Sequence, residues 1–375
     1  MASPNKMEMP PLGAARAMID TPALLIDLDL MEGNIRLLFD QARQVGIQVR
    51  PHLKTVKNPI LAQRLLDAGA NGVCVAKLGE AEVMAAAGIE DILITTEIIG
   101  SVKIARFMEL LRKHPRLKVV VDSHAGVDQI AAAAQRLGLV ANVLVEINVG
   151  QNRCGVQPGR PAVELAQYIA TQGSLHFSGV QGYEGHLQHV PNAEERTKLC
   201  EQAMHLLTST VKDLRDAGLA PNIVTTGGTG TWKVCATFQG EGVTEVQPGS
   251  FPFMDVDYRD AIGGQYANSL SVLATVISRP TATRAVVDAG LKALSNDSGD
   301  AAPKDLAGVT YHHGGDEHGI LTWNAGSTPE LQVGDKIELL PSHCDTTINL
   351  FDRYFAFRGD DLEAIWDVST RGKTQ

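Results

Sequence analysis

Lys54 stands at the end of a short apolar run, IQVRPHLK (47–54), in this chain of 375 residues. A lysine amine that is partly neutral condenses with an aldehyde to form a Schiff base. An isolated lysine at a strand end is more often a solvated cation. The other motifs of the sequence must therefore decide between these two interpretations.

Two glycine-containing turns, GGTG (227–230) and PGS (248–250), each follow an apolar run. Backbone N–H groups in such turns can bind a phosphate, and the hydroxyls of Thr229 and Ser250 can add donors beside Gly249. In a chain with 36 glycines, GGTG alone equally fits a simple tight turn. A phosphate cradle together with a Schiff-base lysine indicates pyridoxal phosphate. A sugar-phosphate enzyme with a catalytic lysine would share both features.

Three further polar side chains lie at or after the ends of other apolar runs. Arg153 follows ANVLVEINV (141–149), Tyr183 ends LHFSGVQGY (175–183), and His189 lies six residues beyond that tyrosine. Each also has an interpretation without chemistry. Arg153 could pair with a surface acid, and Tyr183 and His189 could be rim or core side chains whose polar atoms are hydrogen-bonded. Because the carboxyl ends of barrel strands meet at one rim, we expect these residues to share a site.

A second polar motif, PSHCD (341–345), lies near the C-terminus. In an extended segment His343 and Asp345 point to one side and Cys344 to the other. An imidazole and a carboxylate can hold a divalent ion, and a thiolate ligand would make a softer site that suits zinc. His-x-Asp pairs are common without a metal. The nearby DEH (316–318) is either a turn or part of the same pocket.

The elements that must position these residues alternate between two types for about two hundred residues. Continuous apolar runs predict parallel strands that are covered on both faces, and the segments between most of them have helical periodicity. Eight strands suggest a closed (β/α)₈ barrel; an open doubly wound sheet is the alternative, but GxGxxG is absent after the first strand. The eight runs are IQVRPHLK (47–54), GVCVA (72–76), DILITT (91–96), LKVVVDS (117–123), ANVLVEINV (141–149), LHFSGVQGY (175–183), NIVTTG (222–227) and GVTEVQ (242–247).

A ninth run, TPALLIDLD (21–29), precedes these eight. From about residue 265 the chain consists of short β-like segments and turns with almost no helix, which predicts a compact β domain. Since eight strands already close a barrel, we assign the ninth run to that β domain. The expected fold is α/β, with a pyridoxal-phosphate-binding barrel over 30–262 and a β domain over 1–29 plus 263–375 that carries the metal ligands.

One helix shows its start clearly in the sequence. Asn192, with Glu195 three residues later, is typical of a capping box, and Gly218 ends the helical pattern. We expect its apolar face to comprise Leu199, Ala203, Leu206, Val211 and Leu214.

Composition excludes several functions. The formal net charge of −10 argues against nucleic acid or an anionic membrane as the main partner. No apolar stretch approaches the roughly 18 residues of a membrane span, and the N-terminus lacks the apolar region of a secretory signal. Five scattered cysteines without a CxxC pair favour a reducing cytoplasm over a disulfide framework.

The ordered set of motifs resembles the metal-activated, pyridoxal-phosphate-dependent D-threonine aldolases over roughly residues 20–370. This family is alanine racemase-like (fold type III) and related to D-serine dehydratases. The resemblance implies a barrel with a β domain and a homodimer. The motifs are RPHLKTVK (50–57), GQNRCGV (150–156), QGYEGHLQH (181–189), TTGGTG (225–230), QPGSFPFMDVDY (247–258), VVDAGLK (286–292), DEHG (316–319) and PSHCDTTINLFD (341–352).

The resemblance also implies roles for the candidate residues at the cofactor. Lys54 corresponds to the lysine that forms the Schiff base. Arg153 would face the phenolic oxygen of the cofactor, and Tyr183 would border the cofactor and the substrate. The residues implied for the cofactor phosphate are Thr229, Gly249 and Ser250.

For the metal, the resemblance implies His343 and Asp345 as ligands, with His189 beside them as the catalytic base. A carboxylate ligand favours a harder ion such as Mn²⁺ or Mg²⁺. The chain departs from the usual family pattern at Ala76, Phe251 and Thr346, where relatives often carry Gln, Tyr and Pro.

The implied reaction is cleavage of a D-β-hydroxy-α-amino acid to glycine and an aldehyde by a carbon–carbon lyase. A D-serine or 3-hydroxy-D-aspartate dehydratase, which releases a keto acid and ammonia, is the alternative, although those enzymes tend to carry His-x-Cys in place of His-x-Asp. A 3-hydroxy-D-aspartate aldolase is a variant of the first hypothesis. A non-catalytic pyridoxal-phosphate carrier is the third, and such carriers lack the long β domain.

Overall fold

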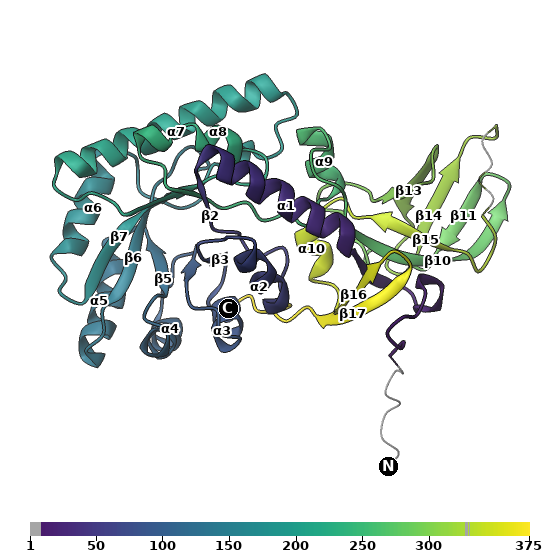
Figure 1. Cartoon of the computed structure of the whole chain (residues 1–375), viewed down its shortest axis with the longest axis horizontal. Coiled ribbons are helices and arrows are strands. Elements are labelled where there is room, and N and C mark those ends of the chain that lie inside the picture. Colours follow the sequence, from purple (N-terminus) through teal and green to yellow (C-terminus); the bar gives the residue numbers. More distant parts are fainter. Residues whose placement is uncertain (1–8, 327–328, 330) are drawn as a thin grey trace, which may run out of the picture. The chain divides into compact units, whose positions relative to one another are not determined.

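Eight short strands form a parallel barrel in the computed structural model, which describes residues 9–326, 329 and 331–375 (Figure 1). Their hydrogen-bonded order is β2-β9-β8-β7-β6-β5-β4-β3, and a parallel bridge between His52 and Cys74 joins the first and last strands. The bounds are β2 Gln48–Val49, β3 Val73–Val75, β4 Ile92–Ile94, β5 Lys118–Val121, β6 Ala141–Glu146, β7 Leu175–Gly182, β8 Ile223–Thr226 and β9 Glu245–Val246. The predicted barrel and each of its eight runs are confirmed.

The barrel strands are buried along nearly their whole length, as expected for strands with side chains packed on both faces. One interior layer joins four consecutive strands through Cys74, Leu93, Val120 and Leu144, all with no exposed surface. This packed interior leaves chemistry to the residues at the ends of the strands.

Helices separate the barrel strands along the chain. Five of them begin after a side chain that accepts a hydrogen bond from the third backbone N–H beyond it, namely Asp27, Asn58, Ser123, Asn192 and Asp255. The predicted cap at Asn192 is thus confirmed, but Leu206 is 42% exposed and lies off the buried face. The bounds are α1 Leu28–Val45, α2 Pro59–Asp67, α3 Leu78–Ala86, α4 Ser101–Lys113, α5 His124–Leu137, α6 Arg160–Ala170, η2 Gly185–Leu187, α7 Ala193–Asp216, α8 Trp232–Ala236, η3 Gln239–Glu241 and α9 Val256–Ile262.

An ion-pair network is buried at the end of the barrel where the strands begin. Arg50 donates to Glu245 at 2.7 Å and also pairs with Asp91, which accepts from Lys118 at 2.9 Å. Burial alone lowers the pKa of Arg50, but the carboxylates of Glu245 and Asp91 raise it above its ordinary value. This network stabilises the barrel at the end that is remote from the expected site.

Within the described residues the second sheet has nine strands, seven of them in the order β13-β14-β11-β10-β1-β16-β17, with β15 pairing to β10 and β12. The N-terminal strand β1 pairs antiparallel with β10 and parallel with β16, which confirms that it joins the C-terminal sheet. The bounds are η1 Arg16–Met18, β1 Ala23–Asp27, β10 Leu270–Thr281, β11 Arg284–Val287, β12 Ala302–Pro303, β13 Val309–His313, β14 Gly319–Trp323, β15 Lys336–Leu340, α10 Cys344–Ile348, β16 Arg353–Arg358 and β17 Asp361–Asp367.

The chain divides into two compact units. The barrel unit comprises residues 35–251, 260–265 and 372–375, and the β unit comprises residues 9–34, 252–259 and 266–371. The β unit has its own apolar core, formed by Ile19, Ala23, Leu25, Leu273, Phe357 and Leu362. Among the described residues, no helix combines the length and apolar character needed to cross a membrane.

Candidate active site

Lys54 lies in a turn immediately after the bridge that joins β2 to β3. Its backbone N–H donates to Nδ1 of His52 at 3.2 Å, and the backbone N–H of His52 donates to the carbonyl of Pro248 at 3.1 Å. The lysine turn is therefore attached to the PGS turn that follows β9. Residues almost two hundred positions apart in the sequence become neighbours because β2 and β9 pair directly.

Gly249 is required where the lysine turn and the PGS turn touch. A Cβ at this position would lie 2.9 Å from the carbonyl oxygen of His52, too close for any side chain. The next residue, Ser250, donates its backbone N–H to Oγ1 of Thr229 at 3.1 Å. The structure thus brings together four predicted residues of the barrel unit, Lys54, Thr229, Gly249 and Ser250.

The GGTG loop does not offer all of its N–H groups to a ligand. The N–H of Gly227 donates to Glu184 at 3.3 Å, that of Gly228 to Thr231 at 3.1 Å, and that of Gly230 to Gln188 at 2.9 Å. The expectation that these glycine N–H groups bind a phosphate is therefore wrong. Within this loop the N–H of Thr229 has no acceptor among the described residues.

Three donors at this corner fit a phosphate group. Among the described residues, the N–H groups of Thr229 and Gly249 have no acceptor, and the hydroxyl of Ser250 has no partner. All three residues are buried, with Thr229 4% and Ser250 5% exposed. Buried N–H groups without an acceptor are rare, and phosphate oxygens supply what these groups need. The residues present therefore fit the phosphate of pyridoxal phosphate.

Arg153 and Tyr183 meet in the barrel unit. The guanidinium carbon of Arg153 lies 5.9 Å from the centre of the Tyr183 ring, within the range of a cation–π contact. Arg153 is exposed and Tyr183 is half-buried. His189 is also half-buried, and it lies on the same segment as Tyr183, beyond η2.

The PSHCD motif of the β unit has a different backbone from the one expected. His343 is extended, but α10 begins at Cys344, so the prediction of an extended segment through Asp345 is wrong. The cause is a long-range contact, because the N–H of Cys344 donates to Asp255 at 2.9 Å and fixes the start of the helix. Cys344 itself is fully buried, and burial raises the pKa of its thiol well above the usual range, so a thiolate ligand is unfavourable.

His343 is arranged as metal-binding histidines commonly are. Its Nδ1 donates to Asp297 at 2.7 Å, so Nε2 would be the atom available to a metal. Asp297 also accepts from Ser295 at 2.6 Å and from Thr346 at 2.8 Å. Burial alone raises the pKa of Asp297, but these hydrogen bonds lower it to about 2. His343 thus fits a divalent ion, with Asp345 two residues along as the predicted second ligand, and Thr346 supports Asp297 with a hydroxyl that a proline would lack.

The DEH segment, in contrast, forms the turn between β13 and β14. Glu317 pairs with Lys292 at 2.6 Å, and both side chains are exposed. Of the two interpretations of this segment, a turn is the one that the structure shows.

Sequence reasoning missed several buried polar residues near the carboxyl ends of the barrel strands. Glu146 ends β6 and accepts from Gln181 at 2.5 Å, and Gln181 accepts from Gln247 at 2.9 Å. Glu184 lies just beyond β7 and has no exposed surface. A charged residue inside or next to an apolar run was the available signal, because such a residue must find partners when it is buried.

Comparison with known proteins agrees with this architecture. Residues 26–256 match the family described as alanine racemase, N-terminal domain, and residues 269–357 match a putative serine dehydratase domain. The chain is 40% identical to the D-threonine aldolase of an Arthrobacter species over 96% of this chain and 95% of that protein. It is 38% identical to the 3-hydroxy-D-aspartate aldolase of Paracoccus denitrificans over 96% and 94% of the two chains.

A solved structure with the same fold is the D-threonine aldolase of Filomicrobium marinum, with a TM-score of 0.93, 39% identity, and coverage of 98% of this chain and 100% of that one. The chain therefore belongs to the alanine racemase-like family that combines this barrel with a serine dehydratase-type domain. It is an enzyme, a pyridoxal-phosphate-dependent lyase.

Proposed function

We propose that the enzyme is a D-threonine aldolase that cleaves the Cα–Cβ bond of D-β-hydroxy-α-amino acids to give glycine and an aldehyde. The observation that carries this proposal is the attachment of the Lys54 turn to the PGS turn, beside the open N–H groups of Thr229 and Gly249. That arrangement supports a cofactor held by a Schiff base at one end and by its phosphate at the other. The close aldolase relatives support the choice of reaction.

Each residue then has a defined task. Lys54 would hold the cofactor through its aldehyde. Thr229, Gly249 and Ser250 would donate hydrogen bonds to the phosphate, while Arg153 and Tyr183 would orient the ring. When bound, pyridoxal phosphate supplies an electron sink for the electron pair of the broken bond.

The proton of the β-hydroxyl must leave as the Cα–Cβ bond breaks. We assign its removal from the hydroxyl oxygen to His189, whose imidazole is the type of base suited to neutral pH. His343 and Asp345 would hold a divalent ion, with Mn²⁺ or Mg²⁺ favoured by the carboxylate, and the ion would supply Lewis-acid chemistry. The family resemblance also favours a homodimer, which light scattering would report as twice the chain mass of 40.1 kDa.

A dehydratase is the second candidate, favoured by the match of residues 269–357 to a serine dehydratase domain. In that reaction the Cα–H bond breaks, the β-hydroxyl leaves, and a keto acid and ammonia result. The aldolase reaction keeps the nitrogen in glycine. The two candidates therefore differ in every product.

Product analysis of the holoenzyme with D-threonine decides between them. We expect glycine and acetaldehyde, with no reaction of L-threonine and loss of turnover when EDTA removes the divalent ion. A panel that includes D-3-hydroxyaspartate and D-phenylserine would then rank the β-substituents. Release of 2-oxobutanoate and ammonia would assign the dehydratase reaction instead, and Lys54→Ala provides the inactive control.

A further inference from the structure

Glu184 is a fully buried carboxylate that the proposed mechanism does not use. Its Oε2 accepts from the hydroxyl of Thr226 at 3.0 Å and from the N–H of Gly227 at 3.3 Å. Its Oε1 accepts from the hydroxyl of Thr231 at 2.5 Å and from the amide of Gln188 at 3.2 Å. Gly227 and Thr231 are the first and last residues of the loop 227–231. Glu184 therefore holds both ends of this loop through hydrogen bonds.

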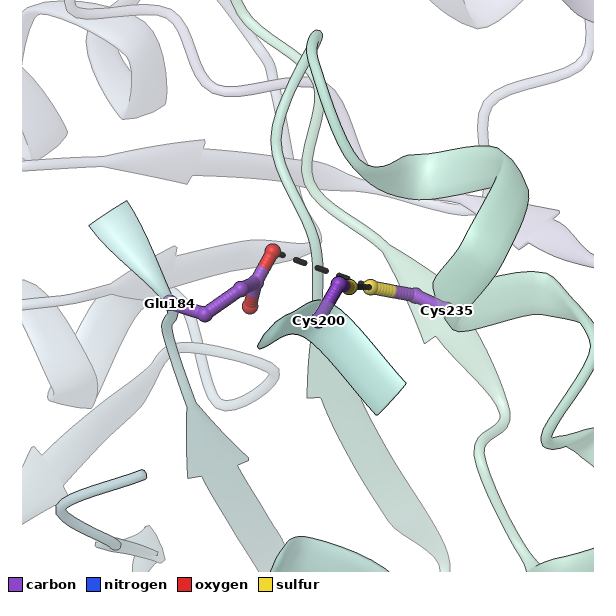
Figure 2. Close-up of side chains that lie close together, drawn as sticks. All are labelled: Glu184, Cys200 and Cys235. Carbon is purple, nitrogen blue, oxygen red and sulfur yellow. Dashed lines mark hydrogen bonds between the residues drawn. The ribbon is translucent and has the colours of Figure 1, made fainter. Parts of the chain in front are cut away.

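Two thiols complete the surroundings of this carboxylate. Figure 2 shows Glu184 beside Cys235 and Cys200, and the thiol of Cys235 lies 3.6 Å from both Oε1 of Glu184 and the sulfur of Cys200. Burial raises the pKa of Cys235 well above its ordinary value, so its sulfur keeps a proton to donate. A metal ion here would need thiolates and would displace the donors that already occupy Glu184. In this cluster the thiol of Cys235 contacts Cys200 and donates to the carboxylate of Glu184.

Gln188 links Glu184 to a third residue of the loop, Gly230. Its Oε1 accepts from the N–H of Gly230 at 2.9 Å while its amide nitrogen donates to Glu184. A Cβ on Gly228 would lie 2.5 Å from Oε1 of Gln188, and a Cβ on Gly230 would lie 2.4 Å from the backbone carbonyl oxygen of Gln188. The glycines of GGTG thus allow close contact with Gln188, and the loop N–H groups on both sides of Thr229 are fixed.

We propose that Glu184, acting through Gln188 and Thr231, is the positioning residue for the cofactor phosphate. It does not touch the phosphate; it fixes the loop 227–231 so that the N–H of Thr229 stays open beside Gly249. This inference rests on the proposed phosphate site. It predicts that loss of the carboxylate weakens binding of the phosphate without changing the chemistry at Lys54.

A glutamine cannot replace this carboxylate, whichever way its amide is turned. With its nitrogen in place of Oε2, the amide faces the N–H of Gly227, and two donors meet. With its nitrogen in place of Oε1, it faces the amide nitrogen of Gln188, which cannot turn over without losing the N–H of Gly230. Glu184→Gln therefore leaves a buried donor without an acceptor in either orientation.

The test compares two aldehydes on the full chain stripped of cofactor. Pyridoxal phosphate and pyridoxal both form a Schiff base, but only the former has a phosphate. We expect Glu184→Gln to raise the dissociation constant for pyridoxal phosphate by about tenfold or more and to leave that for pyridoxal unchanged. Glu245→Gln is the matched control, since Glu245 is 1% exposed in the same barrel but bonds Arg50 and Asn71.

If Glu184→Gln binds both aldehydes as the wild type does, or loses affinity for both equally, the inference is wrong. An equal loss in Glu184→Gln and Glu245→Gln for pyridoxal phosphate would also overturn it. Should Glu184→Gln fail to fold, Thr231→Val removes one donor of Glu184 and must show the same selective loss. A wild type that forms no Schiff base with either aldehyde would instead refute the proposed cofactor site.

Discussion

Glu146 illustrates how a barrel interior changes the chemistry of one residue. It is almost fully buried at the end of β6. Burial, together with the nearby carboxylates of Glu97 and Asp122, raises its pKa to about 8, against the opposing effects of Gln181 and Arg153. At neutral pH this side chain is therefore mostly a neutral acid, which explains how the barrel tolerates it.

This shifted pKa predicts how stability depends on pH. The unfolded chain releases the Glu146 proton near the ordinary pKa of 4.5, whereas the folded chain keeps it up to about pH 8. Within that window the unfolded state binds fewer protons, so the free energy of unfolding falls by about 1.4 kcal/mol per pH unit from this group. Glu146→Gln should remove this fall and become increasingly more stable than the wild type as the pH rises from 5 to 8.

Urea unfolding of both proteins without cofactor, at several pH values, measures this difference. Glu164→Gln, at an exposed position, is the control and should follow the wild type. A constant difference between Glu146→Gln and the wild type across the pH range would show that Glu146 does not hold its proton. The pKa of about 8 would then be wrong.

At the scale of elements, the sequence predicted what depends on local pattern. The strands of the barrel are readable because Val, Ile and Leu fill both faces, as in VCV of β3 and ILI of β4. The start of α7 is readable because Asn192 accepts a bond from Glu195, three residues away. These features depend only on residues that are close together in the sequence.

What could not be predicted depends on partners far apart in the sequence. The start of α10 depends on Asp255, which is 89 residues before Cys344. Thr226, Gly227 and Thr231, which donate to Glu184, lie 42 to 47 residues away from it, so these contacts are invisible before the fold is known. The predicted apolar face of α7 includes Leu206, which is exposed, whereas the next residue, Leu207, is buried. A single sequence carries no signal for such distant contacts.

The ion-pair network at the start of the barrel strands gives a prediction at this scale. Arg50 links β2 to β9 through Glu245 and also pairs with Asp91. Arg50→Met would leave Glu245 buried without its cationic partner, which costs about 3–5 kcal/mol, while Asp91 would keep Lys118. Arg106→Met is the control, because Arg106 pairs with Glu82 at the surface, where a pair contributes about 0–1 kcal/mol.

Urea midpoints of the two variants report this difference directly. Equal, small losses would show that the buried network contributes no more than a surface pair. The barrel would then depend on its apolar layers alone.

At the scale of the whole molecule, the two groups of candidate residues belong to different units. Lys54, Thr229, Gly249 and Ser250 lie in the barrel unit, and His343 and Asp345 lie in the β unit. The two family matches follow the same division, with one over residues 26–256 and the other over 269–357. Cofactor binding and metal binding should therefore be separable by mutation.

His343→Ala tests this separation. Without its imidazole the β unit loses one of two proposed ligands, so we expect activity with D-threonine to fall to the level of EDTA-treated wild type and to become insensitive to added Mn²⁺. The absorption band of the Lys54 Schiff base should persist, because every residue assigned to the cofactor lies in the barrel unit. His318→Ala, at an exposed position in the same unit, should change neither property. If His343→Ala lost the Schiff base as well, the two functions would not be separable; if it kept its response to Mn²⁺, His343 would not be a ligand.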